Sequence, residues 1–276
     1  MDGPFPRLLV LRRRLGTFAD WLAIASAVAL PWSTTATAVL IATWFVTLLG
    51  SWNIPERCRE QWTAAAALPV VLWGFGILGV LWAGVPWAER LASLNSFQKL
   101  FMVPFLALQF RDSHRGMWVL IGFLISSTVL LIVSWGLILL PDLAWRGRER
   151  MIGVPVKDYI SQNAIFTLCI IGLAEGAFFA WHKGSRRSSL ALVLLAIAFF
   201  TNILYASVSR TALVALPILL LLFAFRRLGW KSAAGLLIAM LMFLAVAWPT
   251  SQPLRARVTE LFDVILDHRP RAIFSP

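Results

Sequence analysis

Apolar runs long enough to cross a bilayer, separated by short segments rich in arginine, fill most of this 276-residue chain. A helix needs about 20 apolar residues to span the hydrocarbon core of a membrane, which is about 30 Å thick. The sequence therefore predicts an all-α, polytopic transmembrane helical bundle of about nine spans over residues 1–249, followed by the start of an extracytoplasmic segment over 250–276. We place the spans at residues 17–32, 35–52, 64–83, 97–110, 117–140, 161–181, 189–207, 211–225 and 232–249.

Composition excludes several other classes of protein. Hydrophobic residues make up 59% of the chain and charged residues 14%, whereas an ordinary soluble domain is about 45–50% apolar and about 25% charged. A soluble globular enzyme, a disordered chain and a disulfide scaffold are therefore excluded. Cys58 lies in a polar loop and Cys169 in an apolar run, so no disulfide is predicted, and no metal-ligand spacing or phosphate-cradling glycine loop occurs. We predict no metal and no cofactor.

The charge of the chain is strongly positive, with 25 Lys+Arg against 13 Asp+Glu and a net charge of +12. The basic residues punctuate the apolar runs and do not gather on one soluble face, so no nucleic-acid partner is predicted. If the N-terminus is cytoplasmic, every predicted cytoplasmic loop carries its own basic pair or cluster, as the positive-inside rule requires. These groups are Arg12–Arg14, Arg57 with Arg59, Arg111 with Arg115, Lys183 with Arg186 and Arg187, and Arg226 with Arg227 and Lys231.

The opposite side of the predicted bundle is unusually basic, although positive charge is normally depleted there. The loop over 141–160 carries four basic residues, and two interpretations stay open for them: a solvated loop face, or part of a site for a polyanion. They are Arg146, Arg148, Arg150 and Lys157. The polar residues that follow this loop either cap the next helix or line the same polyanion site. They are Asp158, Tyr159, Gln162 and Asn163, and of these only Asp158 has a side chain able to act as a base.

Arg210 lies between two apolar runs with almost no loop around it. An arginine so close to the hydrocarbon is costly unless it snorkels to the interface or meets an anion. It is thus either an interfacial anchor or a planar, bidentate group that binds phosphate. The hydroxyls of Ser207, Ser209 and Thr211 would add donors to the same anion.

Glu175 is an acid within a strongly apolar predicted span. Carboxylates inside a membrane are candidates for proton relays, while the small residues Ala174, Gly176 and Ala177 around this one favour a polar contact between closely packed helices. Both interpretations stay open. Asn202 on the next span is a plausible partner for Glu175.

The segment from Tyr205 to Leu216, Tyr-Ala-Ser-Val-Ser-Arg-Thr-Ala-Leu-Val-Ala-Leu, resembles the Ser-Arg-(small)-(small) signature of the O-antigen ligase and polymerase superfamily. Ser161-Gln162-Asn163 before an apolar helix is similar to that family as well. So is the order of the chain, in which two more spans and a basic outer segment follow the Ser-Arg pair. Similarity of specific residues extends over roughly residues 155–216.

The resemblance implies an inverting, metal-independent glycosyltransferase at the periplasmic face of the bacterial inner membrane. Its donor would be a glycan linked to undecaprenyl diphosphate, and its acceptor lipid A-core in a ligase or another lipid-linked glycan in a polymerase. Arginines of the family bind the donor diphosphate. Arg210, with Ser209 beside it, matches the first of them, and Arg271 or, less closely, Arg257 would supply the second.

The chain departs from the family pattern near its end. Family members carry a large periplasmic loop, with a histidine proposed as the catalytic base, and then further spans, whereas this sequence ends at residue 276 where that loop would grow. We therefore expect a chain truncated in the periplasmic loop. His268 does not share the family's histidine context, so no catalytic base is assigned. The alternatives are a membrane transporter or lipid flippase with Glu175 as its proton site, and an inactive fragment of the ligase family.

Overall fold

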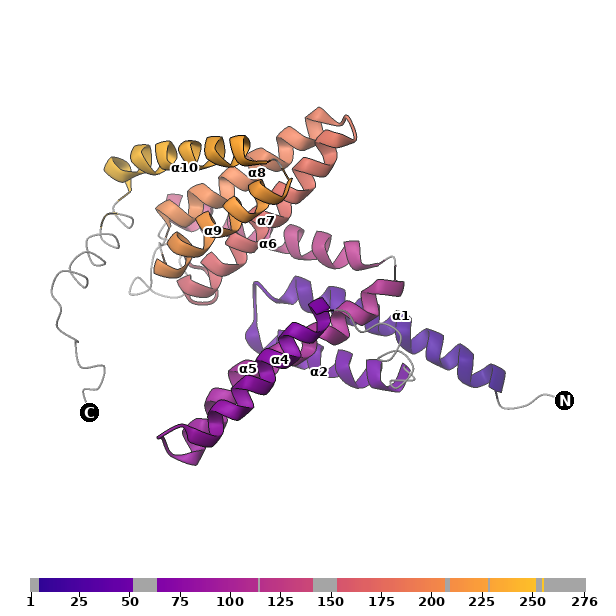
Figure 1. Cartoon of the computed structure of the whole chain (residues 1–276). Coiled ribbons are helices and arrows are strands. Elements are labelled where there is room, and N and C mark those ends of the chain that lie inside the picture. Colours follow the sequence, from indigo (N-terminus) through magenta and orange to yellow (C-terminus); the bar gives the residue numbers. More distant parts are fainter. Residues whose placement is uncertain are drawn as a thin grey trace. The chain divides into compact units, whose positions relative to one another are not determined.

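The computed structural model describes residues 5–51, 64–113, 115–140, 153–206, 209–227, 229–251 and 255. In these residues every regular element is an α-helix, which confirms the predicted all-α class (Figure 1). The helices are α1 (Phe5–Ala29), α2 (Thr34–Ser51), α4 (Ala64–Trp82), α5 (Trp87–Asp112), α6 (Gly116–Leu139), α7 (Tyr159–His182), α8 (Arg186–Tyr205), α9 (Arg210–Arg227) and α10 (Trp230–Thr250).

The helices coincide with the predicted apolar segments, but two of them begin earlier than predicted. α5 starts at Trp87, directly after Pro86 at its N-cap, whereas the apolar run starts near residue 97. α1 starts at Phe5 and carries the helix through Arg12 and Arg14 before the apolar part begins. Hydropathy detects only the apolar part of a helix. Alanine, leucine, glutamate and arginine continue the helix outside that part because their helix propensity is high.

Five helices of the described residues are long and apolar enough to cross a membrane, which supports a multi-pass membrane protein. They are α2, α6, α7, α8 and the Ala233–Thr250 part of α10, and Ala67–Trp82 in α4 is a shorter apolar helix. α9 is 18 residues long and has Arg210 at its start and Arg226 and Arg227 at its end.

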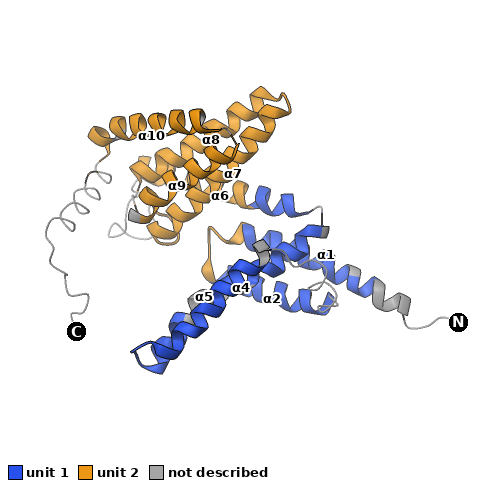
Figure 2. Ribbon diagram, viewed as in Figure 1, with its two compact units in different colours: residues 1–27, 35–122 blue, residues 28–34, 123–276 orange. Residues whose placement is uncertain are grey.

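The helices form two compact units (Figure 2). Unit 1 comprises Met1–Ala27 and Thr35–Gly122, and unit 2 comprises Val28–Thr34 and Phe123–Pro276. The core of unit 1 joins α1, α2 and α5: Ala19 and Leu22 of α1 pack with Trp44 and Leu48 of α2, against Phe105 of α5. α4 packs on α5 within the same unit.

Unit 2 is built on the antiparallel pair α7 and α8, which makes the most extensive helix contact in the described chain. Phe166 of α7 and Phe199 of α8 are fully buried and meet edge to face, with ring centroids 4.9 Å apart. α6 and α9 complete this core, and α10 packs on α9. Large apolar side chains elsewhere on these helices face outward, such as Ile132, 65% exposed, and Met242, 66% exposed. Outward apolar faces of this kind are what a lipid environment requires.

Candidate functional site

A buried polar cluster lies in unit 2 where α6, α7 and α8 meet. We call it the Gln162 cluster, and it consists of the side chains of Ser134, Gln162 and Asn202 with the carbonyl of Gly153. The exposed fractions of the three side-chain residues are 0%, 3% and 0%. Buried polar groups are stable only when they are hydrogen-bonded, so the partners of each group decide what the cluster does.

Each group of the Gln162 cluster finds a partner within the cluster. The Ser134 hydroxyl donates to the Gly153 carbonyl at 2.6 Å, and the Asn202 amide donates to the Ser134 oxygen at 2.9 Å. The Gln162 amide donates to the Gly153 carbonyl at 3.1 Å and to the Ser134 oxygen at 3.2 Å. The cluster therefore fastens the segment before α7 onto three helices.

Gly153 is constrained by its backbone conformation as well as by the hydrogen bonds to its carbonyl. Its φ of +85° lies in the left-handed region, which only glycine adopts at no steric cost. A Cβ at this position would lie 2.8 Å from Cγ1 of Ile138 and 3.0 Å from Cβ of Ala206. The segment thus passes so close to α6 and to the end of α8 that no side chain fits.

Asp158 caps α7, as one of the two interpretations expected. Its carboxylate accepts from the Ser161 amide at 2.8 Å and from the Ser161 hydroxyl at 2.7 Å. These bonds, the one from the amide first, hold the pKa of the Asp158 carboxyl below its ordinary value of 3.8. A carboxylate made more acidic and occupied by a cap is a poor general base. Gln162, by contrast, belongs to the buried cluster and does not cap the helix.

Lys157 lies beside the turn between α1 and α2. Its ammonium group donates to the carbonyl of Leu30, within unit 2. The same turn is fastened to α6, because the indole of Trp32 donates to the Ser126 hydroxyl at 2.9 Å and that hydroxyl donates to the Val28 carbonyl at 2.6 Å. The one described member of the predicted basic loop is therefore held half-buried at this end of unit 2.

Ser209 and Arg210 lie at the start of α9. Arg210 is the first residue of the helix, and the buried Ser209 precedes it as the cap, its hydroxyl oxygen accepting from the Ala212 amide at 3.1 Å. The positive end of the α9 dipole is thus at the predicted Ser-Arg pair, and helix N-termini favour anions. As a donor to a diphosphate, Ser209 remains a prediction.

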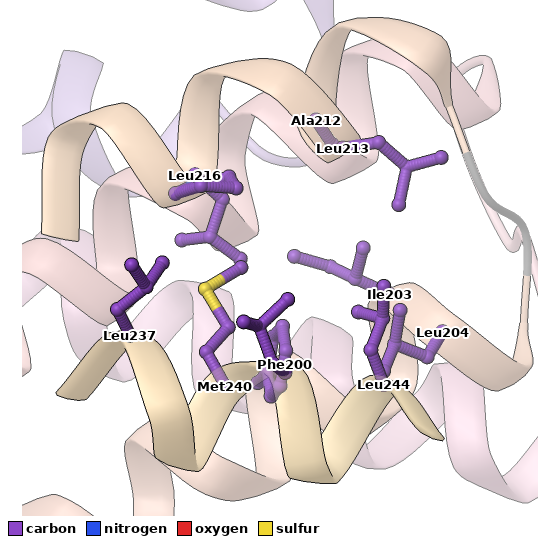
Figure 3. A pocket seen from close by; sticks show the side chains of 11 residues that line it. Phe200, Ile203, Leu204, Ala212, Leu213, Leu216, Leu237, Met240 and Leu244 are labelled. Carbon is purple, nitrogen blue, oxygen red and sulfur yellow. The ribbon is translucent and has the colours of Figure 1, made fainter. Parts of the chain in front are cut away.

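An apolar cavity of about 260 Å³ begins immediately beyond this helix start, between α8, α9 and α10 (Figure 3). Ala212 and Leu213 of α9 line it, two and three residues after Arg210. Its other walls come from α8 and α10, including Phe200, Ile203, Met240 and Leu244, and every lining side chain is apolar. An apolar space next to a helix N-terminus with an arginine suits a molecule that has both an anionic and an apolar part.

Glu175 and Asn202 have different partners, so the expected pairing of the two is wrong. The Glu175 carboxylate binds Arg227 at the end of α9, with Nη2 2.9 Å and Nε 3.0 Å from Oε2. Asn202 is bonded to Ser134 in the Gln162 cluster. The contact joins α7 to α9, as the helix-packing interpretation of Glu175 expects.

Five further predicted binding residues lie outside the residues that the structure describes. They are Arg146, Arg148, Arg150, Arg257 and Arg271. Among the predicted binding residues, the structure places Lys157, Ser209 and Arg210 at the same end of unit 2. Lys157 lies just before α7, and Ser209 and Arg210 lie at the start of α9. In the described ranges no three His, Cys, Asp or Glu side chains lie together as a metal site would need.

Two polar groupings were missed by the sequence reasoning. Ser134 and Gly153 complete the Gln162 cluster, and the only signal for them is a serine in an apolar run and a glycine in a polar segment. In unit 1, Asp20 of α1 is 9% exposed and accepts from the Gln109 amide at 2.7 Å and the Ser113 hydroxyl at 2.9 Å. Trp44 donates to the same Gln109 at 2.6 Å, so α1, α2 and α5 share one polar network.

Comparisons with known proteins give no match: no protein-family model, no curated protein and no solved structure is similar to this chain.

Proposed function

We propose that this chain is an O-antigen ligase-like glycosyltransferase that binds a glycan linked to undecaprenyl diphosphate at the periplasmic face of the bacterial inner membrane. One observation carries the proposal. The Ser209–Arg210 start of α9 lies directly beside an apolar cavity whose wall continues along the same helix through Ala212 and Leu213. A lipid-linked diphosphate has the same two parts, an anionic head and a long apolar chain.

In the proposed reaction a hydroxyl of lipid A-core, or of another lipid-linked glycan, attacks the anomeric carbon of the donor sugar. The bond to the diphosphate oxygen breaks, undecaprenyl diphosphate leaves with the electron pair, and the proton of the attacking hydroxyl passes to solvent. Arg210 would stabilise the negative charge that grows on this leaving group, and a preorganised cation in a dry site is most effective there. Lys157, Arg146, Arg148 and Arg150 would attract the anionic substrates, and Arg271 or Arg257 would supply the second diphosphate contact.

A binding experiment tests the proposal at both parts of the site. Arg210→Ala should weaken binding of undecaprenyl diphosphate to the purified protein in nanodiscs by at least about tenfold, because a charge-assisted phosphate contact is lost. Arg226→Ala is the matched control, since it removes an exposed arginine from the other end of α9. Equal loss in both variants, or none in either, contradicts the proposal.

The cavity is tested separately with Met240→Trp, which fills the space between α9 and α10. This variant should lose affinity for undecaprenyl diphosphate and keep its affinity for a short isoprenyl diphosphate, because only the long chain needs the cavity. In cells, Arg210→Ala expressed at the normal level should lose O-antigen attachment to lipopolysaccharide. Normal attachment would exclude the proposed role of Arg210.

Transport has less support as an alternative function. Its proton site would be Glu175, and the structure pairs that carboxylate with Arg227 at 2.9 Å. A paired carboxylate on a helix contact is better explained by packing than by proton transfer.

A further inference from the structure

The end of unit 2 opposite the Gln162 cluster carries a dense group of cations. We call this group the basic end, and it comprises Lys183, Arg186 and Arg187 at the α7–α8 turn and Arg226, Arg227 and Lys231 at the α9–α10 turn. All six residues are exposed. The sequence contains no Asp or Glu between Glu175 and Glu260, so the only described carboxylate near these turns is that of Glu175, which binds Arg227.

The Glu175–Arg227 pair joins α7 to the end of α9 within unit 2. Arg227 is the last residue of α9, and His182, the last residue of α7, is seven positions after Glu175. At 1.5 Å per residue, α7 continues for about 10 Å from the ion pair to its last residue. α9 has 18 residues and is about 27 Å long, slightly shorter than a hydrocarbon core of about 30 Å. The basic end thus has cations both at the end of α9 and at the α7–α8 turn.

Several cations of the basic end lie over aromatic rings. Nζ of Lys183 is 4.4 Å from the ring centroid of Phe179, and Cζ of Arg186 is 5.7 Å from that of Trp181. Phe179 and Trp181 are 59% and 58% exposed, and Trp230 at the start of α10 is 70% exposed. Exposed aromatic rings favour the membrane interface. The basic end thus offers cations that lie over exposed aromatic rings.

Within the described residues, Glu175 compensates only one of these six cations, Arg227. Arg186 and Arg187 lie in the first turn of α8, where the helix dipole is itself positive, and that turn has no acidic residue. A charge bias that only sets topology needs basic residues in the loop and no particular arrangement of them. The contacts between these cations and the exposed aromatic rings are an arrangement that suits a bound anion with an apolar part.

We propose that the basic end binds the phosphate headgroups of anionic phospholipids, of the phosphatidylglycerol class, in the adjoining membrane leaflet. The headgroup phosphate lies between the α7–α8 turn and the end of α9, and the acyl chains run along the outward apolar faces of α7 and α8. This site is independent of the proposed diphosphate site, because Arg210 and Arg227 lie at opposite ends of α9.

The test measures lipid binding to the purified full chain. In detergent micelles, phosphatidylglycerol should raise the melting temperature, and phosphatidylcholine and inorganic phosphate at equal concentration should not. Replacing Lys183, Arg186 and Arg187 together by Gln should weaken phosphatidylglycerol binding by at least about tenfold, since each cation near a lipid surface contributes about a fivefold factor. The matched control replaces Arg12, Arg14 and Arg111 by Gln, which removes the same charge from unit 1.

Three outcomes would overturn the proposal: equal loss of affinity in the control, equal shifts with the two lipids, or an equal shift with inorganic phosphate. The first would mean that net charge alone attracts the lipid, and the third that the site takes a soluble anion. If the triple variant does not fold, Lys183→Gln and Arg187→Gln are measured singly. Both residues are exposed, and each variant should weaken lipid binding by about fivefold.

Discussion

Gly153 is the residue on which the packing of the Gln162 cluster depends most directly. Its φ is +85°, and a Cβ would lie 2.8 Å from Ile138. Gly153→Ala should therefore lower the free energy of unfolding by about 2–4 kcal/mol, from backbone strain and overpacking together. Thermal unfolding in detergent measures this loss. Gly136→Ala in α6 is the control, because no atom lies within 4 Å of its added Cβ, and its melting temperature should stay the same or rise slightly.

Asp158 gives a prediction that depends on pH. Asp158→Ala removes the cap of α7 and should cost about 1 kcal/mol near neutral pH, whereas Asp158→Asn should cost much less because asparagine also caps helices. The pKa of this carboxyl is lowered in the folded protein, so its contribution is present above the ordinary value of 3.8 and is lost as the pH falls through the folded value. Urea unfolding from pH 7 to pH 3 should show the wild-type advantage over Asp158→Ala shrinking below about pH 4. An advantage that does not change down to pH 3 would exclude the charged cap.

The sequence predicted few of these residue-level contacts, for a physical reason. Capping by Asp158 was predictable, since the residue directly precedes an apolar helix and Ser161 follows at the usual spacing. The Gln162 cluster was not, because Ser134, Gln162 and Asn202 are distant in sequence and meet only when three helices pack. Periodicity carries no information about which polar side chain of one helix faces that of another.

At the scale of elements, the Glu175–Arg227 contact joins α7 to α9. The two side chains are 37% and 39% exposed, so a double-mutant cycle should give a coupling of about 0.2–1 kcal/mol in detergent. Glu175→Gln, Arg227→Gln and the double variant are compared by thermal unfolding. The same cycle with Arg226, the preceding residue on α9, is the control and should give a coupling near zero. If Arg226 couples to Glu175 as strongly as Arg227 does, general charge attraction explains the contact.

Most helices were predictable from hydropathy, because a segment that must sit in lipid has to be apolar over its whole length. The starts of α1 and α5 were not, since charged residues such as Arg12 and Arg14 in α1 and Glu89 and Arg90 in α5 interrupt the apolar pattern there, and the helix continues because of local propensity. The division into two units was not visible either. Its boundary falls inside α6, between Gly122 and Phe123, within one continuous apolar run.

At the scale of the whole molecule, the distribution of charge in unit 2 predicts its orientation. The basic end lies at the α7–α8 and α9–α10 turns, and the α1–α2 turn lies at the other end, where Lys157 contacts Leu30. Positive charge is retained on the cytoplasmic side. We therefore expect the α7–α8 turn in the cytoplasm and the α1–α2 turn in the periplasm.

Cysteine labelling measures this orientation. In a variant with Cys58 and Cys169 replaced by Ala, Ser185→Cys marks the α7–α8 turn and Thr34→Cys marks the start of α2, and both positions are exposed. A maleimide that cannot cross membranes should label Thr34→Cys in intact spheroplasts and Ser185→Cys only after permeabilisation. The reversed pattern would place the basic end outside, against the charge bias. Labelling of both from one side would mean that the two positions share a face of the membrane, and the alternating arrangement of spans would be wrong.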